Sequence, residues 1–79
     1  MRKLYKELLP ALSSRELSLH NEGYVFVTKK DIFNYLKEKW DKNTDISDIV
    51  DDIMHVDGYD ISKFIKNEVL YRRDLYEEK

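Results

Sequence analysis

The side chains that could act as nucleophile, base or metal ligand are few and form no recognisable catalytic motif. The only imidazoles are those of His20 and His55, and each stands among ordinary surface residues. The pair Ser13-Ser14 has neither the glycine-rich elbow nor the positioned base that an activated serine requires. Cysteine is absent, so thiolate metal sites and disulfides are excluded. We therefore expect no enzymatic activity and no cofactor.

The acidic turn Asp57-Gly58-Tyr59-Asp60 is the closest approach to a metal site in the sequence. A calcium-binding EF-hand loop places oxygen ligands at regular positions and closes with a bidentate Glu. The turn lacks that spacing and the closing Glu, so the sequence predicts no calcium site and no other metal site.

Acidic charge is concentrated between residues 43 and 62. This segment contains no Lys or Arg and has Asp at positions 45, 48, 51, 52, 57 and 60, whereas the net charge of the chain is only −2. A solvated helix face would explain these residues by stability alone. The functional interpretation is a docking surface for a basic protein, with the candidate contact residues Asp48, Asp51, Asp52 and Tyr59. The same acids argue against DNA binding, because a recognition helix must approach phosphates.

Basic charge is concentrated in residues 29–42, which contain five Lys and three acidic residues. Lysines and aromatic rings together bind single-stranded RNA through phosphate contacts and base stacking. Direct RNA binding is therefore an alternative, with Tyr35 or Trp40 as stacking residue and with the basic candidates Lys29, Lys30, Lys37, Lys39, Arg72 and Arg73. A third alternative is self-association to a homodimer through apolar stripes that the fold leaves uncovered.

The elements that position these residues are predicted to be helices. Gly and Pro together number three, and apolar residues recur at helical spacing. This pattern indicates an all-α protein, a compact single-domain bundle of four to five short helices over residues 1–79. Pro10 lacks a backbone donor and disfavours helical geometry before it, so we expect a kink or break there, with a new helix beginning at about Pro10. The predicted helices are 1–9, 10–22, 29–41, 45–56 and 60–76.

Local signals mark where these helices begin and end. Gly23 can adopt the left-handed conformation that ends a helix, and Thr28 with Asp31 three residues later has the capping-box pattern. Either Thr44 or Asp45 is suited to cap the next helix, and Asp60 the last one.

Two apolar stripes indicate which side chains are buried. Trp40 shares a stripe with Phe33 and Leu36, so we expect it mainly in the core. The clearest amphipathic pattern belongs to the predicted helix 45–56, whose stripe contains Ile46, Ile49, Val50, Ile53 and Met54.

The beginning of the chain, MRKLYKELL, is charged and contains no long apolar run. It predicts neither a signal peptide nor a membrane-spanning helix, so we expect a cytoplasmic protein without membrane insertion.

The order and spacing of several short motifs resemble one family of bacterial proteins. The motifs are Leu9-Pro10-Ala11-Leu12, Gly23-Tyr24, Val27-Thr28 and Lys39-Trp40, followed by Ile49-Val50 and Ile53. Over roughly residues 8 to 70, the chain is similar to the ComN-type post-transcriptional regulators of Gram-positive bacteria.

The resemblance implies a cytoplasmic regulator of late-competence gene expression that acts on messenger RNA after transcription. It also implies association with a DivIVA-type scaffold protein at the cell poles and septum, and it offers no catalytic residue. The family pattern leads us to expect basic residues after the Lys-Trp pair, but this chain has Asp41, Lys42 and Asn43. The departure favours a protein-binding adaptor over direct RNA contact.

Overall fold

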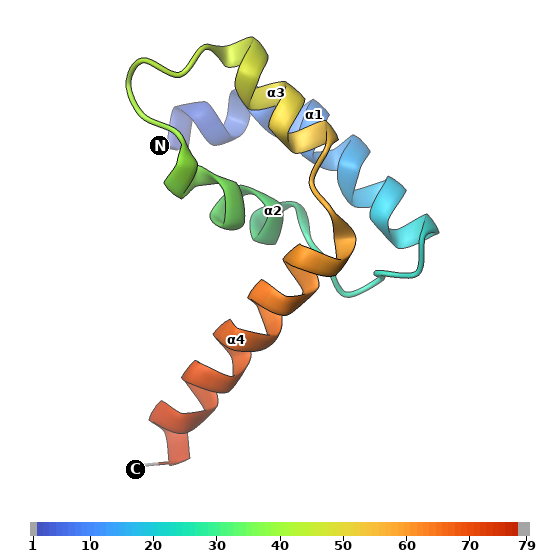
Figure 1. Ribbon diagram of the computed structural model, residues 1–79, viewed down its shortest axis with the longest axis vertical. Helices are drawn as coiled ribbons and strands as arrows, with labels where there is room; N and C mark the ends of the chain where they lie inside the picture. The colour runs from blue at the N-terminus through green and yellow to red at the C-terminus, as the bar shows by residue number, and fades with distance from the viewer. Residues whose placement is uncertain (1, 78–79) are drawn as a thin grey trace.

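The protein is built from helices (Figure 1). The computed structural model describes the backbone of residues 2–77 and the side chains of residues 3–67. Its α-helices are α1 (Arg2–Asn21), α2 (Lys29–Leu36), α3 (Ile46–Met54) and α4 (Gly58–Glu77), and a 3-10 helix, η1 (Lys37–Lys39), follows α2. No strand occurs within residues 2–77. The predicted all-α class is therefore confirmed.

The helices form a packed body from which one helix extends. α1, α2 and α3 contact one another in pairs, whereas α4 packs mainly on α2. Figure 1 shows that the beginning of α4 lies against this body, whereas the C-terminal part of α4 extends away from the other helices. Both α3 and the beginning of α4 therefore belong to the packed body.

The core is formed by apolar side chains from all four α-helices and from two linkers. The ring of Phe33 on α2 packs edge-to-face against Tyr5, at 5.1 Å between centroids, and against Trp40, at 5.9 Å. The buried apolar residues are Leu8, Leu12, Leu19, Val27, Ile32, Phe33, Leu36, Ile49, Ile53, Val56 and Ile61. No polar side chain among the described residues is buried with them.

The predicted break at Pro10 is wrong, because α1 continues through it and unites the predicted helices 1–9 and 10–22. Proline removes one helical hydrogen bond. Pro10 is exposed, so water can reach the carbonyl that loses its donor. Leu8 and Leu12, on either side of it, are both buried in the same core. Tertiary burial therefore outweighs the local preference for a break.

The predicted signals between α1 and α2 are confirmed. Gly23 has φ +106°, the left-handed conformation. The Thr28 hydroxyl accepts from the Asp31 backbone N–H at 3.2 Å, and the Asp31 carboxylate accepts from the Thr28 backbone N–H at 3.1 Å, which is a complete capping box. At the beginning of α3, Asp45 holds the N-cap position, but its side chain makes no capping hydrogen bond.

Two predicted helices end earlier than expected. The predicted helix 29–41 becomes α2 followed by the tighter turn η1, after which the backbone of Trp40 is extended. The predicted helix 45–56 ends at Met54. Its last residue, Val56, is instead buried within the linker to α4. In both places a side chain packs against the core from a residue outside the α-helices, which periodicity alone does not reveal.

The predicted helix 60–76 begins earlier than expected, at Gly58. The backbone carbonyl of Asp57 accepts the first helical hydrogen bond, so Asp60 lies in the first turn and does not cap. Gly58 packs directly against the ring of Tyr24, and a Cβ atom at this position would overlap the ring. The glycine thus allows the beginning of α4 to approach the linker after α1.

Candidate functional site

Exposed carboxylates cover α3 and the first turn of α4. We call this set the acidic surface; its members are Asp45, Asp48, Asp51, Asp57 and Asp60, all of them exposed. Among the described side chains, no Lys or Arg pairs with any of them. Within the described part of the chain, the acidic surface makes one ionic contact, between His55 Nδ1 and Asp51 Oδ1 at 3.3 Å, and both side chains are largely exposed. The acidic surface therefore has unused capacity to attract cations.

Asp52 differs from these acids because the fold already uses its carboxylate. It is half-buried, and its Oδ2 accepts a hydrogen bond from Trp40 Nε1 at 3.1 Å. This bond joins α3 to the segment after η1, beside the edge-to-face contact of Trp40 with Phe33. The sequence suggested Asp52 as a contact for a protein partner and Trp40 as a stacking residue for RNA, but in the structure the two side chains bind each other. The carboxylate of Asp52 therefore contributes to the fold.

Tyr59 lies at the edge of the acidic surface and is 58% exposed. The Lys63 ammonium lies 5.1 Å from the centre of its ring, at cation–π distance. The Ser62 hydroxyl donates to the Tyr59 carbonyl at 2.9 Å and supports this first turn of α4. Tyr59 is thus available for a partner, and Lys63 marks where the acidic surface ends.

A hollow separates the end of α2 from α3 and the beginning of α4. Its cavity volume is about 160 Å³, below the roughly 300 Å³ at which small-molecule pockets begin. Its lining combines residues of both charges with apolar ones, namely Tyr35, Leu36, Lys39, Asp52, His55, Val56, Asp57 and Asp60. Because these residues come from α2, η1, α3, α4 and the linker before α4, no sequence pattern indicates the hollow. Its size fits part of one side chain better than a whole ligand.

The lysines predicted to bind RNA do not form one surface. Lys29 is half-buried and fixed to α1, since its backbone N–H donates to Glu16 Oε2 at 2.9 Å and its Nζ to Ser13 Oγ at 3.4 Å. Lys39 lies 5.9 Å from the centre of the Tyr35 ring.

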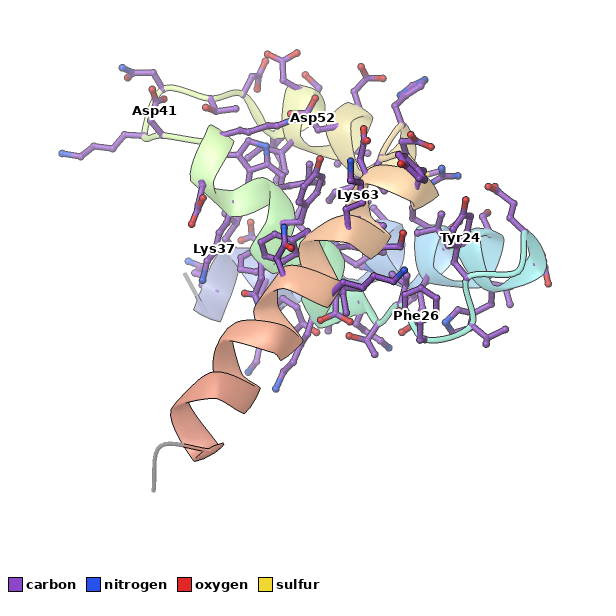
Figure 2. All side chains as sticks on the ribbon, turned by 60° about the horizontal axis from the view of Figure 1, so that its bottom comes forward. Tyr24, Phe26, Lys37, Asp41, Asp52 and Lys63 are labelled. Atoms are coloured by element: carbon purple, nitrogen blue, oxygen red, sulfur yellow. The ribbon has the colours of Figure 1, made fainter. Side chains whose placement is uncertain are left out.

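Lys30 and Lys37, seven residues apart, share one side of the α2 segment. Figure 2 shows Lys37 on a different side of the molecule from Asp52. Trp40 uses its indole N–H for Asp52. The side chains of Arg72 and Arg73 lie outside the described residues. Only Lys30 and Lys37 therefore remain of the predicted basic set as neighbours on one side.

Two of the residues first considered for catalysis, His20 and Ser13, take part in the junction between α1 and α2. His20 Nε2 donates to the Val27 carbonyl at 2.6 Å and holds the linker against α1. Ser13 accepts the Lys29 hydrogen bond. Across the described residues, no group of His, Asp and Glu side chains is arranged to hold a metal ion.

Sequence reasoning overlooked the contacts of Arg15. Its guanidinium donates to the Val56 carbonyl at 2.5 Å and lies 3.8 Å from the Glu22 carboxylate. This connection joins α1 to the linker between α3 and α4, and so it positions the acidic surface. A signal was present, because Arg15 lies three residues after Leu12 and four before Leu19, on the buried side of α1.

Among the comparisons with known proteins, the one with family models gives a match. None of the described helices has the length and apolar character needed to cross a membrane. No curated protein and no solved structure matches the chain significantly. A family model described as post-transcriptional regulator matches residues 1–79. The predicted membership of a post-transcriptional regulator family is thus confirmed, and since the match spans the whole chain, this protein belongs to the post-transcriptional regulator family.

Proposed function

We propose that this regulator acts without catalysis, as an adaptor that binds a positively charged protein on the acidic surface. The observation that supports it best is the exposure of Asp48 and Asp51 on one helix without a pairing Lys or Arg among the described side chains. Unpaired charges of one sign steer a partner of opposite sign and set the orientation in which it docks. Tyr59 adds an exposed aromatic ring at the edge of this surface.

Protein binding is favoured over direct RNA binding because the lysines predicted to contact RNA do not form one surface. Lys29 is held by α1, and Trp40 by Asp52. A binding site for single-stranded RNA combines a continuous basic groove with stacking rings. Lys30 and Lys37 by themselves supply two charges and no adjacent free ring. Regulation of messenger RNA would accordingly pass through the bound protein.

The finer identity of the system belongs to the same proposal. The ComN-type resemblance implies control of late-competence genes and a DivIVA-type scaffold as partner. Recruitment to such a scaffold would place the regulator at the poles or septum of the cytoplasm. Basic side chains on the scaffold would face the acidic surface.

Capture of the purified DivIVA-type scaffold by the immobilised regulator tests the proposal. The test variant combines Asp48→Lys with Asp51→Lys, and the matched control combines Glu7→Lys with Glu38→Lys, exposed acids on α1 and η1. Both variants change the net charge equally. We expect the test variant to lose capture and the control to retain it. Undiminished capture by the test variant would contradict the proposal.

The competing functions have separate readouts. RNA binding through Lys30 and Lys37 would appear as a retarded RNA band that weakens steeply with salt and disappears with Lys30→Glu and Lys37→Glu. Self-association would appear as a dimer mass by light scattering. Either result together with intact scaffold capture by the acid-reversal variant would replace the adaptor proposal.

A further inference from the structure

The apolar stripe of α3 is wider than the part that the core covers. Ile49 and Ile53 are 4% and 0% exposed, whereas Ile46 and Met54 are 49% and 41% exposed. Val50, which lies four residues from each of them, is half-buried. Residues four apart in a helix lie along one side. Ile46, Val50 and Met54 therefore form an uncovered apolar strip beside the buried one, which we call the α3 strip.

The α3 strip has an acidic border. At about 100° per residue, Asp51 lies beside the strip and is 72% exposed, whereas the exposed Asp48 lies on the side of the helix opposite Val50. No Lys or Arg occurs anywhere in residues 43–62. The complement of such a face is an apolar stripe bordered by cationic side chains, which is the pattern of a basic amphipathic helix.

The length of the α3 strip agrees with this complement. Eight residues separate Ile46 from Met54, which corresponds to about 12 Å along the helix axis. A helix that docks in this way presents anchors at positions i, i+3 or i+4, and i+7, which span a similar length. Two turns of a partner helix would cover all three side chains.

The acidic border of the α3 strip also favours some binding partners over others. A second copy of this chain, packed on the strip with twofold symmetry, would bring Asp51 towards the Asp51 of its neighbour, which like charges oppose. RNA would bring phosphates to the same carboxylate. A basic helix meets neither obstacle.

We propose that the α3 strip is the anchoring site for one basic amphipathic helix of the partner protein. The apolar side chains of that helix cover Ile46, Val50 and Met54, and a Lys or Arg side chain at its edge lies against Asp51. This inference rests on the proposed adaptor function, to which it adds the kind of segment recognised and the apolar residues that hold it.

A synthetic helical peptide of about 18 residues, with Leu on one side and Lys on the other, serves as the probe. Two control peptides have the same composition in scrambled order, or Glu in place of Lys. Fluorescence anisotropy measures affinity, and amide chemical shifts of the isotope-labelled wild-type regulator locate the site. We expect binding of the basic peptide alone, with the largest shift changes in residues 46–54.

Substitutions then separate the α3 strip from the rest of the surface. Ile46→Ser with Met54→Ser should weaken peptide binding at least about tenfold, because both exposed side chains lose apolar burial. Leu17→Ser, at a position on α1 that is 62% exposed, should leave affinity unchanged. The shift map comes from the wild-type chain, so it remains decisive even if a variant folds poorly.

The outcomes distinguish this inference from the proposed function. Shift changes centred on α1 or α2, equal binding of the Glu peptide, or a dimer that Ile46→Ser and Met54→Ser dissociate would overturn the inference. Loss of scaffold capture on reversal of Asp48 and Asp51, with capture retained by the strip variant, would overturn it while leaving the adaptor proposal intact. Capture insensitive to the acid reversal, with peptide shifts on the α3 strip, would remove the adaptor proposal alone.

Discussion

The junction between α1 and α2 and the surface of α3 use their polar side chains in different ways. At the junction, Thr28 and Asp31 cap each other, Glu16 accepts from the Lys29 backbone, and His20 donates to Val27. On α3, the exposed carboxylates have solvent and His55 as neighbours. Polar groups that satisfy the backbone stabilise the fold, whereas exposed like charges contribute little to stability or oppose it.

The comparison implies that the two regions were shaped by different requirements. The junction positions α2 against α1 and gains stability from its hydrogen bonds. The acidic surface gains nothing comparable for the fold, so its charges are free to serve recognition. Substitutions should therefore divide into those that change the free energy of unfolding and those that change partner binding.

The largest expected effect on stability comes from the core beneath both regions. Leu12 is fully buried on α1, and Leu12→Ala should lower the free energy of unfolding by about 2–5 kcal/mol through lost burial and a residual cavity. Leu17→Ala, on the same helix but 62% exposed, should change it by less than about 0.5 kcal/mol. Urea denaturation measures both, and equal losses would show that α1 does not bury the side that the structure assigns.

The contact between the linker after α1 and the beginning of α4 connects the two regions. Gly58→Ala would place a Cβ within 2.6 Å of Tyr24 Cδ2, so we expect a loss of about 1–3 kcal/mol from overpacking. Adding Tyr24→Ala should remove most of this extra cost in a double-mutant cycle measured by thermal unfolding. A Gly58→Ala variant as stable as the wild type would mean that the ring moves aside freely.

The two helix N-caps compare the regions directly. Thr28→Ala removes a complete capping box and should cost about 0.5–2 kcal/mol. Asp45→Ala, at the cap of α3 whose side chain makes no capping bond, should cost clearly less. Chemical denaturation followed by circular dichroism gives both values. A larger loss at Asp45 than at Thr28 would reverse the comparison.

Within α3, neighbouring acids should behave differently. Asp52→Ala removes the acceptor for Trp40 Nε1 and should cost about 0.5–1.5 kcal/mol. Asp52→Asn retains an acceptor oxygen and should restore part of the loss. Asp48→Ala should change stability by less than about 0.5 kcal/mol. Unfolding monitored by Trp40 fluorescence distinguishes them, and indistinguishable values for Asp52→Ala and Asp48→Ala would place Asp52 among the free acids.

Interactions between residues close in sequence were predictable. The left-handed Gly23 and the capping box of Thr28 with Asp31 depend on a few consecutive residues, and both occur as predicted. The amphipathic stripe of α3 likewise placed Ile49 and Ile53 in the core. In each case, the chemical property that determines the structure lies within one or two helical turns.

Interactions across the fold were not predictable in the same way. The sequence alone determined the all-α class, the boundaries of the linker after α1, the segregation of charge and the family motifs. The tertiary structure decided that α1 continues through Pro10, that Asp52 pairs with Trp40, and that Ile46 and Met54 stay exposed. The physical reason is that burial and side-chain pairing depend on which elements meet in space, and these energies exceed the local backbone preferences that a pattern reports.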